Sequence, residues 1–312
     1  MNLLPRPDKQ LFNLPFEIHH GSMAGCIMAA ADGALQTNLI DPTLNAASSP
    51  GRFKPTFGNL FIASVLHYPK LRSITDAQWG YFTYNEAAVV LLVTDTQAPG
   101  GAPQHYWFAP MMILDCVLPL IAGREIYGLP KVFGKIDPGP LVSGSNSTTC
   151  TVAVEGFSRQ DPNEAAAMQP LASANLLLSL GGVDNPTALS PANFLNTIPS
   201  PLGWASDVRN MIDRYIGGLV PGIFLKQFPD VANVGNACQR QLVCADYYPT
   251  KIYSLHLHAA QLTLNAPASY PLATLLGLTP GLVPGLFPGI VTGLVPAFSA
   301  TMDWVLPPGQ PM

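Results

Sequence analysis

Charged residues are scarce in this sequence. Aspartate, glutamate, lysine and arginine together make up 11% of the 312 residues, against about 25% in an average globular protein. The net charge is only -4, and the lysines and arginines form no cluster. Binding to phosphate backbones needs a basic face, so the sequence argues against nucleic acid as a partner. A charge that lies within an apolar stretch is informative here, because an isolated buried charge is costly.

Paired cysteines are also lacking. The five cysteines, at positions 26, 116, 150, 238 and 244, are scattered, and none belongs to a CxxC pair. This pattern argues against a disulfide framework and against a zinc knuckle. The first twenty residues contain no basic stretch followed by an apolar run, so we expect no secretory signal. The default expectation is a reduced, cytoplasmic protein that uses no metal or cofactor.

One long uncharged segment raises the question of a membrane span. Residues 261–302 carry no charged side chain, and residues 276–296 would be long enough to cross a bilayer as a helix. Four prolines within 276–296 interrupt such a helix, because each removes a backbone donor and leaves a carbonyl that lipid cannot satisfy. We therefore expect no transmembrane segment. The segment is predicted to be an apolar Pro/Gly-rich insertion that covers a pocket, packs against another subunit of a homo-oligomer or dips into a membrane surface, and we favour the pocket or the subunit contact.

Strand-like runs dominate the rest of the chain. They are rich in β-branched and aromatic residues or alternate in polarity, and they lie at 57–68, 87–95, 147–157, 240–264 and 300–307. Segments rich in glycine and proline at 98–104 and 137–147 are typical of connections between antiparallel strands.

Helical signals are weaker, and the main ones lie at 161–182 and 200–220. No regular strand–helix–strand alternation occurs, which argues against a doubly wound parallel sheet. The sequence predicts one α+β domain over residues 1–312, with an antiparallel β-barrel or cone-like curved sheet and a few peripheral helices.

Motifs of several enzyme classes are missing. The sequence contains no GxSxG, no P-loop, no HExxH and no GxGxxG. His256 and His258 lie two residues apart on one face of a predicted strand, but no third ligand is near, so we expect a half-buried structural pair. Asp115 and Asp303 lie among hydrophobic residues and are expected to be hydrogen-bonded structural acids.

A lysine in apolar surroundings is the most informative charge. Lys131 ends the stretch GREIYGLPK (123–131), which follows the apolar run 111–122. Such a lysine must find a partner, become neutral or reach water. A neutral lysine amine can attack a ketone to form an imine, and the protonated imine accepts electrons when a neighbouring carbon–carbon bond breaks. Taken alone, however, the local sequence favours a lysine at a strand end whose ammonium group reaches water.

The residues around Lys131 resemble those of the acetoacetate decarboxylase family. MMxLD (111–115), GRE (123–125) and PK (130–131) keep the family's order and spacing, and YNE (84–86) resembles its Tyr-x-Glu. Similar pieces continue at 224–252 and 298–310, with insertions at 95–104 and 280–296.

The resemblance implies the family's curved-sheet fold and a Schiff base on Lys131. It also implies an active-site place for Glu86, which would move protons or steer the bound group. The alternative for Glu86 is an ordinary exposed acid on a strand. We expect Met111, Leu129 and Val132 to support the site with apolar surface. Arg124 and Glu125 are expected to form a structural ion pair or network beside the site and not to act as catalysts. Neighbours on a strand point to opposite faces, so the two cannot both point at the substrate.

The sequence also departs from the family pattern. Val132 replaces a second lysine of the family's decarboxylase, and Leu129 replaces an aromatic residue. No counterpart of its N-terminal active-site arginine is found near 17–25, and none of its first active-site glutamate near 63–69. The charges that would handle a small carboxylate substrate are therefore thinned out.

These features predict a Schiff-base lyase that acts on a hydrophobic β-keto acid or a polyketide-like carbonyl compound, for example a decarboxylase of secondary metabolism. An aldolase-dehydratase, or a cyclase or isomerase, could use the same lysine. A binding protein that keeps the fold without catalysis is the alternative from another functional class.

Overall fold

The structure is a computed structural model that describes residues 11–184, 206–217, 220–233, 235–278 and 291–312. Within these ranges thirteen strands form one sheet: β1 (Phe16–Ala29), β2 (Phe53–Pro55), β3 (Leu60–Ser73), β4 (Phe82–Asp95), β5 (Gln104–Leu114), β6 (Lys131–Asp137), β7 (Thr149–Gly156), β8 (Ala167–Asp184), β9 (Gly222–Pro229), β10 (Ala237–Ala245), β11 (Tyr248–Leu264), β12 (Val291–Leu306) and β13 (Gln310–Pro311). The helices are α1 (Val117–Ala122), α3 (Ser206–Gly217) and α4 (Leu272–Leu275), with π-helical segments at Leu35–Asn45 and Gly123–Tyr127 and 3-10 turns at Ala77–Trp79 and Gly139–Leu141.

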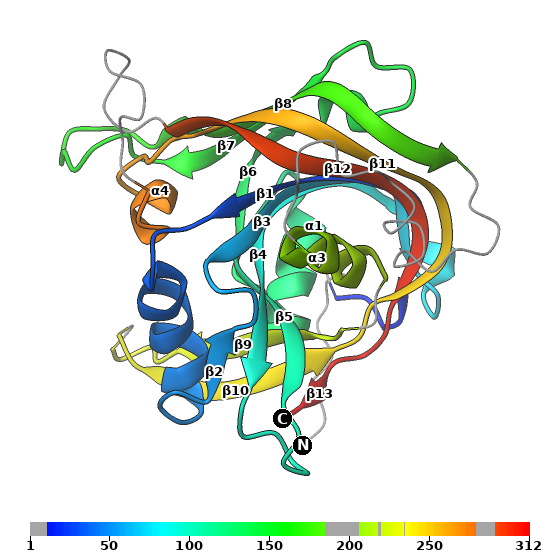
Figure 1. The fold of residues 1–312 in the computed structure, drawn as a ribbon. Coiled ribbons are helices and arrows are strands. Elements are labelled where there is room, and N and C mark those ends of the chain that lie inside the picture. Colours follow the sequence, from blue (N-terminus) through cyan, green and yellow to red (C-terminus); the bar gives the residue numbers. More distant parts are fainter. Residues whose placement is uncertain (1–10, 185–205, 218–219, 234, 279–290) are drawn as a thin grey trace.

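The sheet is strongly curved. Its strand order is β13-β10-β9-β5-β6-β7-β8-β11-β12-β1-β3-β4-β2, and β5 pairs in addition with β4, so two distant parts of the sheet meet at β5. The long strands β8, β11, β12 and β1 bend around a hollow in which α3 lies (Figure 1). The predicted α+β fold with a cone-like curved sheet is confirmed.

The two faces of the sheet carry separate hydrophobic clusters. The inner cluster contains residues of β1, β3, β4, β5 and β12, and α3 adds Met211 and Ile212, which are both 0% exposed. Full burial of one such side chain contributes about 1.5–3 kcal/mol. The outer cluster packs the π-helical segment Leu35–Asn45 and α4 against the other face. Helix α3 therefore packs against the concave face of the sheet, and it bears out the helix predicted at 200–220.

One prediction of secondary structure is wrong. Residues 161–182 were expected to be helical, but β8 occupies Ala167–Asp184 and pairs with β7 and β11. Pro170 lies within the segment and pairs with Ala153 of β7, and a proline inside a helix costs about 3 kcal/mol. Two flanking strands offer the segment a continuous ladder, so tertiary pairing overrides its alanine- and leucine-rich composition.

The expectation of a purely antiparallel sheet also needs correction. Strand β5 pairs in parallel with β6 and, over two residues, with β9. Parallel neighbours need a crossover connection, and α1 together with the π-helical segment Gly123–Tyr127 makes that crossover between β5 and β6. The turns predicted at 98–104 and 137–147 do connect the antiparallel pairs β4–β5 and β6–β7.

The predicted insertion at 276–296 falls mostly on residues 279–290, which lie outside the described residues. Residues 291–296 are not loop but the first part of β12, where Val291 pairs with Leu264 of β11. Among the described residues, no helix is long and apolar enough to cross a membrane.

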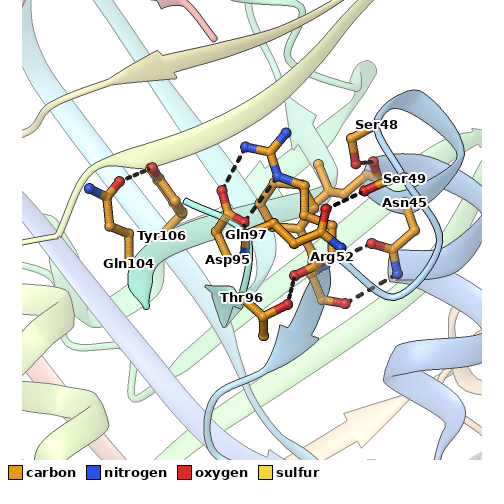
Figure 2. Close-up of polar contacts among 11 residues, drawn as sticks. Asn45, Ser48, Ser49, Arg52, Asp95, Thr96, Gln97, Gln104 and Tyr106 are labelled. Atoms are coloured by element: carbon orange, nitrogen blue, oxygen red, sulfur yellow. Dashed lines mark hydrogen bonds and ion pairs between the residues drawn. The ribbon is translucent and has the colours of Figure 1, made fainter. Parts of the chain in front are cut away.

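A polar network fastens the short edge strand β2 to β4. The Arg52 guanidinium donates two hydrogen bonds to Asp95, from Nε at 3.0 Å and from an Nη atom at 2.7 Å, and Asp95 is 0% exposed (Figure 2). Asn45 accepts a hydrogen bond from the Phe53 backbone N–H and donates one to its carbonyl, which ties the π-helical segment to β2. The bidentate pair and its hydrogen bonds fix one end of β4, the strand that carries Glu86.

Candidate active site

A buried ion pair lies on the inner face of the curved sheet. The Lys131 amine lies 2.7 Å from Oε2 of Glu86. Each of the two residues is only 5% exposed. The lysine therefore does not reach water, and the glutamate is not an exposed strand acid. Both simpler interpretations of the sequence are wrong, because each side chain is buried and finds its partner in the other.

The register of three strands brings the two side chains together. Lys131 opens β6 opposite Met112 of β5, and Glu86 of β4 lies opposite Leu114 of β5. The two charged residues thus flank β5 on either side, about two strand spacings or roughly 10 Å apart. Met112 and Leu114 belong to the inner cluster, and paired residues share a face of the sheet. The long lysine side chain therefore crosses over β5 on the inner face to reach the carboxylate.

Two glycines of the stretch GREIYGLPK make room for this arrangement. A Cβ atom on Gly123 would lie 2.7 Å from both Cδ and Cε of Lys131 and 3.1 Å from its amine. Gly128 has φ +76° and donates its N–H to the Arg124 carbonyl, and a Cβ there would overlap the backbone of Lys226. Gly123 therefore lets the crossover pack directly on the lysine stem, and Gly128 ends the helical turn two residues before β6.

The YNE stretch follows the alternation of a strand. Tyr84 and Glu86 face inward, and Asn85 between them points away. Asp115 accepts hydrogen bonds from the Asn85 backbone N–H at 2.8 Å and from its side-chain amide at 2.7 Å. His67 adds a 2.7 Å contact from Nδ1 to the side-chain amide oxygen Oδ1 of Asn85. These contacts hold the β4 backbone next to Glu86, and they confirm that Asp115 is a hydrogen-bonded structural acid.

Four tyrosines surround the carboxylate. The Tyr68 hydroxyl donates to Oε1 of Glu86 at 3.3 Å, and its ring stacks on Tyr84. Burial, reinforced by the negative charge of Glu86, raises the pKa of Tyr68, Tyr84 and Tyr247 well above the ordinary value of 10. Burial likewise raises the pKa of Tyr215 to about 12. All four hydroxyls therefore stay protonated at neutral pH and act as neutral hydrogen-bond donors.

An apolar cavity opens beside Glu86 on the inner face. Its volume is about 110 Å³, smaller than the roughly 150 Å³ in which an engineered apolar cavity binds benzene. Tyr68, Glu86, Tyr215 and Tyr247 provide its polar groups. The remaining wall is apolar and includes Met23, Trp107, Met112, Phe224, Met302 and Trp304. The hydrophobic β-keto acid or polyketide-like substrate stays a prediction.

A second, polar cavity of about 490 Å³ lies along residues 128–132. Arg124 and Arg240 bring two positive charges to it, and Gln227 and Asn236 add amides. Lys131 lines this cavity and not the inner one, but its amine contacts Glu86, which lines the inner cavity. The two cavities therefore have opposite character, apolar beside Glu86 and cationic beside Arg124.

The predicted supporting residues divide between the two faces. Leu129 packs in the inner cluster, whereas Met111 and Val132 pack with the outer cluster, because alternate residues of a strand point to opposite faces. The neighbour that lines the inner cavity is Met112 and not Met111. A lysine at position 132 would likewise point away from Glu86, so Val132 says little about the charge at the Lys131 amine.

Arg124 and Glu125 do not lie on a strand as expected. They belong to the π-helical turn Gly123–Tyr127, which separates their side chains by helical rotation. Arg124 is exposed at the polar cavity. Neither residue lines the inner cavity.

The sequence analysis missed the tyrosines and tryptophans of the cavity. Tyr68 lies in the segment 63–69 in which a second glutamate was sought, and the same strand alternation that links Tyr84 to Glu86 could have flagged it. Tyr215 comes from α3 and Tyr247 from the turn between β10 and β11. Only the three-dimensional fold brings these two to Glu86.

The remaining candidates are structural. His258 contacts the Ser299 hydroxyl at 2.8 Å, and His256 contacts Asp184 at 3.1 Å. Asp303 accepts from the His20 backbone N–H and from the Tyr253 hydroxyl. The part of the chain that the structure describes holds no group of three His, Cys, Asp or Glu residues suited to a metal ion.

Chemically, the inner site pairs one amine with one carboxylate. Glu86 can accept the ammonium proton and so release a neutral amine, which is the nucleophilic form. The protein supplies this pair in a dry, apolar setting with neutral hydroxyl donors close by. Such an arrangement suits the attack of an amine on a small carbonyl compound.

Comparison with known proteins identifies the relatives of this chain. The family model described as acetoacetate decarboxylase (ADC) matches residues 27–157, which include Glu86 and Lys131. No curated protein matches the sequence.

Solved structures share the fold at low sequence identity. Acetoacetate decarboxylase from Legionella pneumophila is 16% identical with a TM-score of 0.63, over 99% of this chain and 91% of that one. The enduracididine biosynthesis enzyme MppR, complexed with the condensation product of pyruvate and imidazole 4-carboxaldehyde, is 15% identical with a TM-score of 0.59, over 98% and 92% of the chains. An acetoacetate decarboxylase-like enzyme from Sphingomonas wittichii RW1 is 14% identical with a TM-score of 0.59, over 99% and 96%.

Proposed function

We propose that this chain is a Schiff-base enzyme of the acetoacetate decarboxylase family, in which Lys131 forms an imine with a small carbonyl substrate. The match of the family model to residues 27–157 and the shared fold of the solved structures support this proposal. The observation that carries this proposal is the 2.7 Å contact between the Lys131 amine and Glu86 at the wall of the apolar cavity. An amine that is buried beside a carboxylate can lose its proton without releasing it to water.

The proposed reaction begins with proton transfer from the Lys131 ammonium group to Glu86. The neutral amine adds to the substrate carbonyl carbon, and the resulting carbinolamine loses its hydroxyl group as water with a proton returned by Glu86. The product is an iminium ion. When the bond between the α-carbon, which is the neighbour of the iminium carbon, and its carboxyl or other carbon substituent breaks, the bond's electron pair forms a carbon–carbon double bond to the iminium carbon. The π electrons of the iminium move to nitrogen, the substituent leaves as CO2 or as a carbonyl compound, and the result is an enamine. Protonation of the enamine carbon and hydrolysis then release the product and restore the lysine.

Two reactions share this iminium. Loss of CO2 from a β-keto acid makes the protein a decarboxylase, and addition of the enamine to an aldehyde makes it an aldolase, with dehydration as a later step. The low charge of the inner cavity, which lacks an arginine among its described wall residues, favours the aldol-type reaction as a second candidate. The similarity to MppR, whose structure holds a condensation product, supports the same candidate.

Borohydride trapping tests the proposal. Protein incubated with small ketones and aldehydes is reduced with borohydride, weighed intact and mapped by peptide mass. We expect a stable adduct on Lys131 of the wild type and none in Lys131→Met or Lys131→Arg, since arginine keeps the charge but stays protonated. Lys135→Met is the matched control, because Lys135 lies exposed on the same strand. An absence of adducts with every carbonyl compound, or an adduct that persists in Lys131→Met, would overturn the proposal.

A further inference from the structure

The charges around the inner cavity define the kind of substrate that it can take. We propose that the site accepts a small carbonyl compound without a free carboxylate and discriminates against keto acids of the same shape. This inference rests on the imine function proposed above and adds the substrate class to it.

The inner cavity carries few charges. Among the described residues that line it, only Glu86 has a side chain that is charged at neutral pH, and the three tyrosines that line it, Tyr68, Tyr215 and Tyr247, stay neutral. Glu86 is matched by Lys131 at 2.7 Å. The two charges cancel, so the site is electrically neutral before a substrate binds.

The cationic side chains nearest to the site line the polar cavity and not the inner one. Arg124 and Arg240 line the polar cavity, and neither lines the inner one. Among the segments that the structure does not describe, 185–205, 218–219, 234 and 279–290 contain no lysine or arginine in their sequence. Only residues 1–10 add Arg6 and Lys9. The described wall thus offers a substrate carboxylate no partner beyond the lysine that already pairs with Glu86.

Burial of a substrate carboxylate in the inner cavity carries an electrostatic cost. A carboxylate in this cavity would leave the site with a net charge of -1, and an uncompensated buried charge is strongly unfavourable. The net charge of -1 persists during the reaction. An iminium on Lys131 opposite an ionised Glu86 is again a neutral pair, so the substrate carboxylate stays uncompensated. A neutral ketone keeps the site balanced at both stages.

The tyrosines point to the same class of ligand. Their hydroxyls are neutral donors that can bind a carbonyl or hydroxyl oxygen, which accepts hydrogen bonds without adding charge. Apart from these hydroxyls and Glu86, the wall is apolar, and the volume of about 110 Å³ limits the size of the substrate. The site therefore fits a short-chain ketone or aldehyde with an apolar tail, and enamine addition or its reversal is the reaction class that such a compound permits.

A pair of isosteric compounds tests the inference. Acetoacetate and 4-methyl-2-pentanone have the same shape, with a carboxylate in one and an isopropyl group in the other. Adduct formation on Lys131 is measured by borohydride trapping over a range of concentrations, and N-acetyl-lysine in solution corrects for the different reactivity of the two carbonyl groups. We expect the half-saturating concentration to be at least tenfold lower for the ketone.

A variant reverses the preference. Met302 lines the cavity and is 3% exposed, so Met302→Arg places a cation there in a side chain of similar length, and Met302→Gln is the uncharged control. We expect Met302→Arg to move the preference at least tenfold toward acetoacetate and Met302→Gln to leave it unchanged. If Met302→Arg does not fold, the ratio of the half-saturating concentrations of acetoacetate and 4-methyl-2-pentanone in the wild type decides.

The outcomes separate the two proposals. The inference would be overturned, and the imine function left intact, if the adduct formed equally well or better with acetoacetate. The same holds if acetoacetate at similar concentrations released CO2 and left an adduct with the lower mass of acetone. An absence of adducts with both compounds and with the wider carbonyl panel would overturn the imine function, and the inference with it.

Discussion

Gly123→Ala is expected to leave the fold intact and to disable the lysine. Gly123 has φ -62° and ψ -40°, an ordinary helical conformation that alanine adopts readily. By backbone entropy alone, such a change stabilises a protein by about 0.4–1 kcal/mol. The new Cβ would lie 2.7 Å from Cδ and Cε of Lys131, whereas carbon atoms prefer separations of about 3.5–4.0 Å. The flexible lysine end must therefore move by roughly 1 Å.

That displacement separates the amine from its working position. A misplacement of about 1 Å can lower a rate on the order of 100-fold, so we expect adduct formation on Lys131 to fall by about that factor. The rate of adduct formation is measured by adding borohydride at successive times to protein with saturating ketone. A urea unfolding curve measures the free energy of unfolding. Gly123→Ser, of similar size, should behave in the same way.

The result that would refute this reasoning is a wild-type rate of adduct formation in Gly123→Ala with unchanged stability. It would mean that the lysine has free space around it and that the crossover turn does not set the position of the amine. A large loss of stability would also contradict it, because the collision would then fall on the fold and not on the lysine end.

Three further predictions concern neighbouring parts of the molecule. Tyr68→Phe removes the hydroxyl that donates to Glu86 at 3.3 Å, and since a hydrogen bond to a charged group contributes about 1.5–3 kcal/mol, we expect the adduct rate to fall at least tenfold with little change in the half-saturating ketone concentration. Arg52→Ala leaves the 0% exposed Asp95 unpaired and should lower the free energy of unfolding by about 3–5 kcal/mol, as measured in urea. His258 has its pKa lowered to about 4 by burial, so the unfolded chain binds a proton between about pH 6.5 and 4 that the native state does not, and stability should fall with pH across this window. His258→Gln should make that fall shallower.

Each of these predictions has a matched control or a contradicting outcome. Tyr215→Phe removes a cavity hydroxyl that contacts Ser64 and not Glu86, so a rate loss equal to that of Tyr68→Phe would contradict a specific role of Tyr68. Arg159→Ala removes an exposed ion pair and should cost at most about 1 kcal/mol, and equal losses in the two arginine variants would argue against the buried network. An unchanged pH dependence in His258→Gln would show that another group causes the loss.

Local patterns in the sequence predict the fold class and several strands of this protein. Alternating polarity located β3, β4, β7, β10, β11 and β12, and turn residues located two of their connections. Residues 161–182 were mispredicted because their helix-forming composition is overridden by pairing with β7 and β11. The parallel step from β5 to β6 was not predicted, because a single short crossover leaves no periodic signal.

The site is predictable at its two charges and less so around them. A lysine and a glutamate in apolar stretches of a sequence with few charges mark positions that need partners, and Lys131 and Glu86 prove to be partners. The faces of Met111 and Val132 follow from strand register, which the sequence alone does not fix. Tyr215 and Tyr247 reach the cavity from elements far away along the chain, so no local pattern marks them.

Exchange of a ketone's carbonyl oxygen with water tests the central claim most directly, because imine formation and hydrolysis replace that oxygen without any further reaction. The rate of loss of oxygen-18 from a labelled short-chain ketone is measured by mass spectrometry in the presence of the protein. The account predicts that the wild type and Lys135→Met accelerate the exchange and that Lys131→Met does not. Equal exchange with wild type and Lys131→Met would contradict it.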